Sequence, residues 1–206
     1  MSKTKIAVLV SGGGTNLQAL IDAQRSGLLR SGEIVLVVSN KAGAYALERA
    51  AKAGIPALTL TRKELGGTEA FEEALNAALT ERGIELIILA GFMSILSARF
   101  IRRWEKRIIN VHPSLIPSFC GKGFYGLKVH EAALAYGVKV TGATVHYVNE
   151  IPDGGQIILQ QPVFILPGDT PELLQRRVME QAEWRILPEA AELVSARISE
   201  EKEQTP

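Results

Sequence analysis

Short apolar runs rich in β-branched residues recur along the first half of the chain. They cover Ile6–Val10, Ile34–Val38, Ala57–Leu60, Ile84–Leu89 and Ile108–Val111. Because these runs are continuous rather than alternating with polar residues, we expect strands buried on both faces, as in a parallel sheet covered by helices. Segments with the apolar period of a helix separate the first four runs: Asn16–Arg25, Ala44–Ala53 and Thr68–Arg82. The alternation predicts an α/β fold that is doubly wound.

The second half of the chain departs from this alternation. Two prolines and several glycines follow the fifth run and mark a long loop. The elements expected after this loop are a helix at Leu127–Tyr136, strands at Thr141–Val148 and Gln156–Ile165, and a helix from about Pro171 to Ile198. We therefore expect a Rossmann-like, mostly parallel sheet with helices on both faces and antiparallel strands added in its C-terminal half. Glu200–Pro206 is expected to be a frayed polar tail.

The length of 206 residues predicts a single domain over residues 1–206, with a parallel half (1–112) and a mixed half (113–206). Apolar residues make up 47% and charged residues 22% of the chain, which excludes a disordered, collagen-like or coiled-coil protein. The net charge of +1 gives no general attraction to nucleic acid or to an anionic membrane. We expect small-molecule substrates, and a monomer or weak homodimer.

Cysteine content and apolar runs indicate the compartment. Cys120 is the single cysteine, which excludes an internal disulfide framework and a zinc site built on several thiolates. The longest apolar runs are too short or too interrupted to span a bilayer, and the first residues lead directly into a strand pattern without a secretory signal. We expect a cytoplasmic protein that needs no metal.

A glycine-rich segment, Ser11–Asn16, joins the first strand to the first helix. Backbone amides of this segment can face an anion there, together with the helix N-terminus, so the segment predicts a phosphate site. The alternative is a tight turn in which Thr15 caps the helix. No Lys-Ser/Thr pair follows, and Leu17 stands where a dinucleotide fingerprint has its third glycine, so both familiar nucleotide loops are disfavoured.

The strongest chemical signal is the pair Asn110 and His112 at the end of the fifth strand. Residues two apart on a strand point to the same face, and open α/β sheets bind ligands at the carboxyl ends of their strands. Asp153 lies in a second glycine-bearing loop, and a carboxylate beside an imidazole raises the histidine pKa. An amide donor and a cationic imidazole together suit a developing oxyanion. The sequence alone does not establish that Asp153 reaches His112, and a buried structural histidine is the alternative.

The chain resembles the phosphoribosylglycinamide formyltransferase family of purine (IMP) biosynthesis. The resemblance is carried, in order, by Ser11–Ala19, Leu89–Met93, Asn110–Leu115, Gly142–His146 and Asp153–Gly155. It implies an enzyme that transfers the formyl group of 10-formyltetrahydrofolate to the amine of glycinamide ribonucleotide.

The resemblance also implies roles for individual residues. Asn110, His112 and Asp153 would be catalytic, with Asp153 raising the pKa of His112. The ribonucleotide would be held by Gly14, Thr15, Asn16 and Glu183. The folate would be bound by Thr68, Met93, Ser94, Ile95, Leu96 and Asn110, with the Asn149–Asp153 loop lining the pterin slot.

Some positions depart from the family pattern. Ser94 stands where many members carry Arg, and Thr68 where many carry a basic residue near the folate tail, so Arg62 or Lys63 is a candidate substitute. Formyl transfer needs no thiol nucleophile, so Cys120 is not expected to act covalently. His130 is expected to be a structural or surface residue, and His146 at most to orient a neighbouring group.

Other functions compete with this one. Formyltetrahydrofolate hydrolase and methionyl-tRNA formyltransferase resemble the chain in the same three residues, but each carries an added domain that 206 residues do not accommodate. A non-catalytic module that binds a phosphorylated metabolite would leave Asn110, His112 and Asp153 unexplained. An NAD oxidoreductase is disfavoured because the second strand ends in Ser39 and Asn40, without the carboxylate that holds a ribose hydroxyl.

Overall fold

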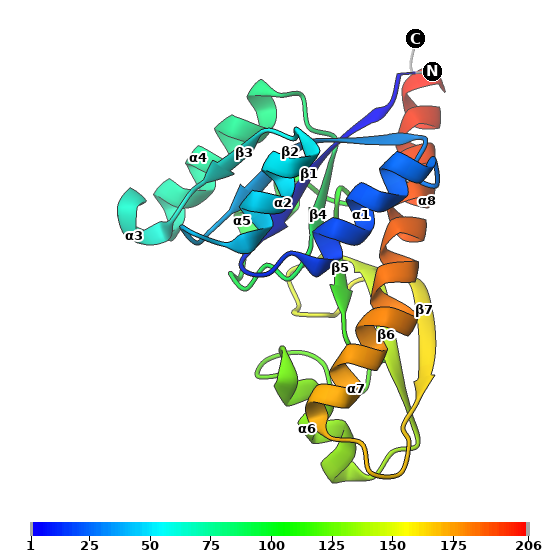
Figure 1. Ribbon diagram of the computed structural model, residues 1–206. Helices are drawn as coiled ribbons and strands as arrows, with labels where there is room; N and C mark the ends of the chain where they lie inside the picture. Colours follow the sequence, from blue (N-terminus) through cyan, green and yellow to red (C-terminus); the bar gives the residue numbers. More distant parts are fainter. Residues whose placement is uncertain (1, 205–206) are drawn as a thin grey trace.

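A computed structural model describes residues 2–204 of the chain (Figure 1). Its strands are β1 (Thr4–Val10), β2 (Gly32–Ser39), β3 (Ala57–Thr59), β4 (Leu86–Leu89), β5 (Ile108–His112), β6 (Val140–Tyr147) and β7 (Ile157–Phe164). Its helices are α1 (Thr15–Ser26), α2 (Tyr45–Ala53), α3 (Arg62–Leu65), α4 (Thr68–Glu81), α5 (Ala98–Arg103), α6 (Leu127–Tyr136), α7 (Pro171–Val178), the π-helix η1 (Met179–Glu183) and α8 (Trp184–Gln204).

The strands form one sheet in the order β3-β2-β1-β4-β5-β6-β7. Pairing is parallel from β3 to β5 and antiparallel for β6 and β7. The expected mostly parallel sheet with antiparallel strands added in the C-terminal half is therefore confirmed. The chain moves outward from β1 in one direction to β3 and then resumes on the other side at β4. The reversal lies between β1 and β4, and doubly wound proteins bind ligands at the carboxyl ends of the strands at such a point.

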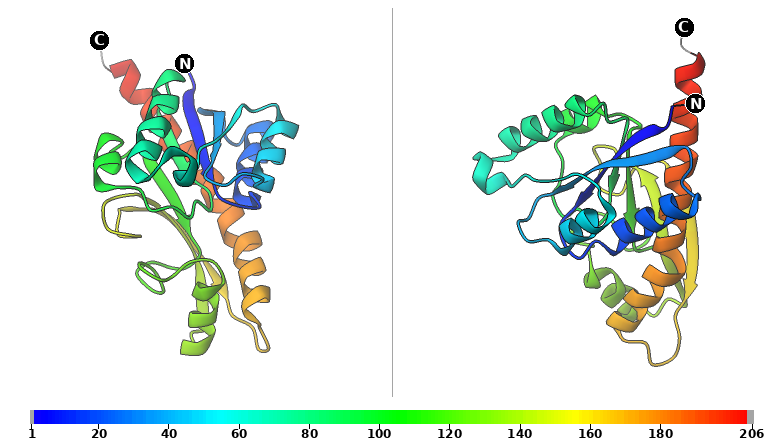
Figure 2. Two further views of the ribbon diagram at one scale, coloured as in Figure 1. Left: turned by 90° about the vertical axis from the view of Figure 1, so that its left-hand side faces the viewer. Right: turned by 45° about the horizontal axis from the view of Figure 1, so that its top comes forward.

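Helices cover both faces of the sheet (Figure 2). Ile6, Val8 and Val10 of β1 pack in the same apolar cluster as residues of α1, α2 and α8. The alternate residues of β1, Ala7 and Leu9, pack in a second cluster with residues of α4 and α5. Because successive side chains of a strand point to opposite faces, a strand buried on both sides must be apolar at every position. This explains the unbroken apolar runs in the sequence.

The helix expected from Pro171 to Ile198 consists of α7 and α8, which the π-helix η1 joins, and it continues to Gln204. It runs along one side of the sheet, and α8 ends near the start of β1 (Figure 1). The expectation of a frayed tail is wrong for residues 200–204, which continue α8; residues 205–206 lie outside the described part. Polar contacts hold this end in place, because Lys202 Nζ lies 2.8 Å from a Glu85 carboxylate oxygen and Arg107 pairs with Glu201 at 2.8 Å.

Two short helices, α3 and α5, were not expected from the sequence. Each begins at a side-chain cap: Thr61 accepts a hydrogen bond from the Glu64 amide, and Ser97 accepts one from the Phe100 amide. Both helices are too short to show an apolar period, so only the caps could have indicated them.

Candidate active site

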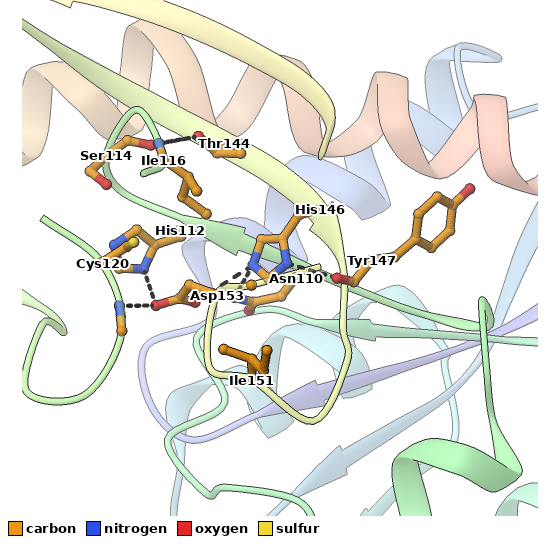
Figure 3. A network of polar contacts seen from close by, with 12 residues as sticks. Asn110, His112, Ser114, Ile116, Cys120, Thr144, His146, Tyr147, Ile151 and Asp153 are labelled. Carbon is orange, nitrogen blue, oxygen red and sulfur yellow. Dashed lines mark hydrogen bonds and ion pairs between the residues drawn. The ribbon is translucent and has the colours of Figure 1, made fainter. Parts of the chain in front are cut away.

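The three residues expected to be catalytic lie together at the carboxyl end of β5 (Figure 3). Asn110 and His112 come from β5, and Asp153 comes from the loop that joins β6 to β7. The His112 and His146 rings stand on either side of the Asp153 carboxylate, with Nδ1 of His112 3.5 Å from Oδ2 and Nε2 of His146 3.6 Å from Oδ1. The structure therefore brings a carboxylate, two imidazoles and an amide to one point.

The protonation pattern of His112 follows from its contacts. Nε2 lies 2.9 Å from the carbonyl oxygen of Phe119. A carbonyl oxygen only accepts hydrogen bonds, so Nε2 carries the proton and donates it. The neutral ring then has its lone pair on Nδ1, the atom that faces Asp153. Nδ1 is therefore the nitrogen that gains and loses a proton in the site.

Burial and charge act in opposite directions on His112. Burial lowers its pKa below the ordinary value of 6.5, and this effect exceeds the opposing influence of the Asp153 charge and of the Phe119 carbonyl. Asp153 thus raises the His112 pKa, as expected, but burial makes the net shift downward. The sequence could not reveal this, because it shows no depth of burial.

Asp153 is held in a constrained backbone conformation at φ 56°. Its Oδ2 accepts a hydrogen bond from the Gly121 amide at 2.8 Å. Burial alone would raise the Asp153 pKa, but contacts with His146, His112 and the Gly121 amide outweigh burial and lower it. The nearby Gly155 is required sterically, because a Cβ there would lie 1.7 Å from the Tyr147 carbonyl oxygen. The carboxylate is therefore ionised and fixed in place.

His146 contacts two of the three expected catalytic residues. It lies directly opposite Asn110 in the antiparallel β5–β6 pairing. Its Nδ1 donates to the Tyr147 carbonyl at 2.9 Å, and its Nε2 lies 3.3 Å from Nδ2 of Asn110 and 3.6 Å from Oδ1 of Asp153. His146 therefore orients the Asn110 amide. Only the register of this strand pair could have revealed the contact from sequence.

The segment Ser118–Tyr125 closes one side of the site. Its Phe119 carbonyl contacts His112 and its Gly121 amide contacts Asp153. Cys120 lies between these residues, and burial together with the Asp153 charge raises the pKa of its thiol. A raised pKa disfavours the nucleophilic thiolate. These contacts link the segment to two of the three expected catalytic residues.

The glycine-rich segment ends in Gly14, which is the N-cap of α1 at φ 72°. No side chain caps this helix, so the alternative in which Thr15 is its cap is wrong. A Cβ at Gly14 would lie 2.6 Å from the Ala46 Cβ, whereas Gly12 and Gly13 face open space. The helix N-terminus therefore lies beside open space at the sheet's ligand-binding edge, as a phosphate site requires.

Asn16 and Glu183, distant in sequence, meet in the interior. Nδ2 of Asn16 donates to Oε2 of Glu183 at 2.7 Å, and both side chains are buried. Burial raises the pKa of Glu183, and the hydrogen bond from Asn16 partly opposes this. Oδ1 of Asn16 has no hydrogen-bond partner in the protein. Glu183 is the last residue of η1, and π-turns recur at functional sites.

The residues expected to bind folate differ in exposure. Met93 and Ile95 are exposed beyond β4, Ser94 is partly buried, and Leu96 is buried in the core. Thr68, at the start of α4, lines a cavity of about 340 Å³ between α4 and α5, and Ser97, which follows Leu96, lines the same cavity.

His130 on α6 was expected to be a structural or a surface residue. It is completely buried, which excludes the surface alternative, and its structural role stays a prediction.

Within residues 2–204, no cluster of three or more His, Cys, Asp or Glu side chains could hold a metal ion. In the same range, no helix is long and apolar enough to cross a membrane.

Comparisons with known proteins agree with this geometry. The model of the formyl transferase family matches residues 4–191. The chain is 44% identical over 184 residues to a phosphoribosylglycinamide formyltransferase of Haemophilus influenzae, covering 89% of this chain and 84% of that protein. It is 48% identical over 195 residues to the trifunctional purine biosynthetic protein adenosine-3 of Gallus gallus. That match covers 95% of this chain but only 19% of the relative.

Solved structures share the fold. The glycinamide ribonucleotide transformylase 1 of Symbiobacterium toebii is 42% identical, with a TM-score of 0.88 over 95% of this chain and 89% of that one. A formyltetrahydrofolate deformylase of Pseudomonas putida is 32% identical, with a TM-score of 0.82 over 97% of this chain and 66% of that one. The second likeness means that the fold alone does not distinguish transfer from hydrolysis.

Proposed function

The chain belongs to the formyl transferase family, and from this we propose that it transfers the formyl group of 10-formyltetrahydrofolate to the amine of glycinamide ribonucleotide in purine biosynthesis. The observation that carries the proposal is the meeting of Asn110, His112 and Asp153 at the carboxyl end of β5. The likeness to phosphoribosylglycinamide formyltransferases supports the choice of acceptor.

In this mechanism the acceptor amine attacks the formyl carbon, and the carbonyl oxygen becomes an oxyanion. Asn110 stabilises it with an amide N–H, because the Asn110 amide is oriented by His146 and has a second hydrogen to donate. His112 stabilises it through Nδ1–H in its protonated form. The C–N bond to the folate nitrogen then breaks, and the proton lost by the attacking amine ends on that nitrogen.

The charge balance of the site suits this step. With a pKa below 6.5, the His112 ring is mostly neutral at pH 7 before substrates bind. A developing oxyanion adds negative charge near Nδ1 and favours the imidazolium form, and the Asp153 carboxylate acts in the same direction. The protonated ring is therefore stabilised most in the transition state, which is where binding energy accelerates a reaction. Asp153 would also position a water that carries the proton between the two nitrogens.

The ribonucleotide would bind at the edge formed by Gly14, Thr15, Asn16 and Glu183. Its phosphate would face the N-terminus of α1, where no side chain supplies an acceptor. The buried Asn16–Glu183 pair would hold the ribose or glycinamide end through the remaining polar atoms, including the unpaired Oδ1 of Asn16.

The pterin would lie against Met93–Leu96 and the Asn149–Asp153 loop. Exposed Met93 and Ile95 offer apolar surface to the flat ring system. Thr68, which lines the cavity between α4 and α5, would contact the folate tail. Arg62 was one candidate to take the place of the basic residues that many members carry at positions 68 and 94. Its guanidinium donates a hydrogen bond to the Ile95 carbonyl.

The test follows 10-formyltetrahydrofolate by absorbance with the pure protein and glycinamide ribonucleotide, water alone, or initiator methionyl-tRNA as acceptor. Deformylation that depends on the ribonucleotide is the expected result. Deformylation without an acceptor would identify a hydrolase, the alternative favoured by the likeness to the Pseudomonas putida deformylase. No deformylation under any condition would overturn the proposal and favour a binding module.

A further inference from the structure

Three consecutive residues after β4, Met93, Ser94 and Ile95, form a segment that we call the 93–95 wall. The side chains of Met93 and Ile95 are 53% and 77% exposed. Apolar side chains that stay in solvent gain nothing from burial, so a loop free to move would tend to fold them inward. Their exposure requires contacts that hold the backbone in place.

Each residue of the wall is held by a different part of the chain. The Met93 amide donates to the hydroxyl of Ser11, just after β1, at 2.8 Å. The Asn40 Nδ2, just after β2, donates to the Ser94 hydroxyl at 2.6 Å. Arg62 on α3 donates through Nη2 to the Ile95 carbonyl. Three elements distant in sequence therefore fix three successive residues.

Arg62 is itself held in position. Its guanidinium lies over the ring of Phe71 at 5.7 Å. Phe71 is completely buried and stacks on Phe92 with 6.5 Å between ring centroids. Phe92, the residue just before the wall, and Arg62, which holds its far end, thus both pack on the buried Phe71 ring.

We propose that Asn40 and Arg62 are positioning residues that hold the 93–95 wall in the conformation that receives the formyl donor. Neither residue touches the reacting atoms, so each acts through Ser94 or Ile95. A wall fixed before binding loses less conformational entropy when the flat ring system docks, and this strengthens binding without changing the chemical step. The inference rests on the proposed function.

The test compares Arg62→Ala and Asn40→Ala with the matched control Lys41→Ala. Lys41 is the exposed neighbour of Asn40. Loss of one hydrogen bond of this kind predicts a KM for 10-formyltetrahydrofolate raised about tenfold in Arg62→Ala and Asn40→Ala. The KM for the ribonucleotide and kcat at saturating donor should stay within about twofold of the wild type, as should all constants of Lys41→Ala.

Calorimetric titration with 10-formyltetrahydrofolate alone separates this inference from the proposed function. A wild type that binds the folate but transfers no formyl group would contradict the proposed function, while weaker binding by Arg62→Ala would still support the wall. Equal folate affinity in the wild type and both variants would overturn the inference, as would a wild type that binds no folate. A lower kcat together with a rise in both KM values would also overturn the inference, because this pattern would indicate general disruption of the fold.

Discussion

Nδ1 of His112 lies 3.5 Å from Oδ2 of Asp153, while Nε2 of the same ring donates to the Phe119 carbonyl. The carbonyl fixes the tautomer, and the carboxylate faces the nitrogen that changes its protonation. The distance is longer than a strong hydrogen bond. Asp153 therefore influences His112 mainly through its charge.

This relationship predicts a pH effect for Asp153→Asn. The Asp153 charge raises the His112 pKa against the effect of burial, so its removal should lower that pKa further. Activity that needs the imidazolium falls as pH rises through this pKa, and in the variant the fall should begin at lower pH. NMR titration of the His112 ring measures the shift directly. An unchanged titration would show that the two groups are not coupled.

Removal of either oxyanion donor should reduce turnover severely. Asn110→Ala and His112→Ala are each expected to lower kcat about 100-fold or more, the scale for loss of an oxyanion-site donor. The KM for the ribonucleotide should change little, because neither residue belongs to its proposed site. Steady-state kinetics with both substrates varied provides the measurement. Near-normal kcat in either variant would remove that residue from the catalytic set.

The Asn16–Glu183 pair predicts a different kinetic pattern. Glu183→Gln keeps the shape and an acceptor for Asn16 but replaces the carboxyl group with an amide at a buried site. The KM for the ribonucleotide should rise on the order of 10-fold, the scale of one lost hydrogen bond, while the KM for the folate stays constant. Equal effects on both KM values would contradict a role confined to the ribonucleotide.

His130 predicts a contribution to acid sensitivity. Its side chain is completely buried and neither ring nitrogen has a partner in the protein. Burial, and to a smaller extent the His112 charge, lowers its pKa from 6.5 to about 4. In the unfolded chain the His130 ring binds a proton below about pH 6.5, but in the folded protein only below about pH 4. The free energy of unfolding therefore falls as the pH decreases from 6.5 to 4, by on the order of 3 kcal/mol.

Denaturant unfolding of the wild type and His130→Leu from pH 7 to pH 4 tests this contribution. The difference in the free energy of unfolding should change with pH in favour of the variant as the solution becomes acidic. A constant difference would show that His130 does not take up a proton on unfolding. The comparison depends on the slope with pH, so a constant packing effect of leucine does not affect it.

The sequence predicted the strands well because residues buried on both faces of a sheet must be apolar throughout. It predicted the Asn110–His112 pair because residues two apart on a strand share a face. It could not show that Asn16 meets Glu183, or that His146 orients Asn110, because both contacts depend on long-range packing and strand register. The effect of Asp153 on the His112 pKa was predicted in the right direction, but the burial that outweighs it could not be read from the sequence.

Direct transfer of the formyl carbon is the central claim, and a labelled donor tests it most directly. The wild-type protein would be mixed with glycinamide ribonucleotide and 10-formyltetrahydrofolate that carries ¹³C in the formyl group, and the products followed by NMR and mass spectrometry. The predicted result is the label in the formyl group of the ribonucleotide product, with formate as a minor species. Label released only as formate would contradict the account and identify hydrolysis as the reaction.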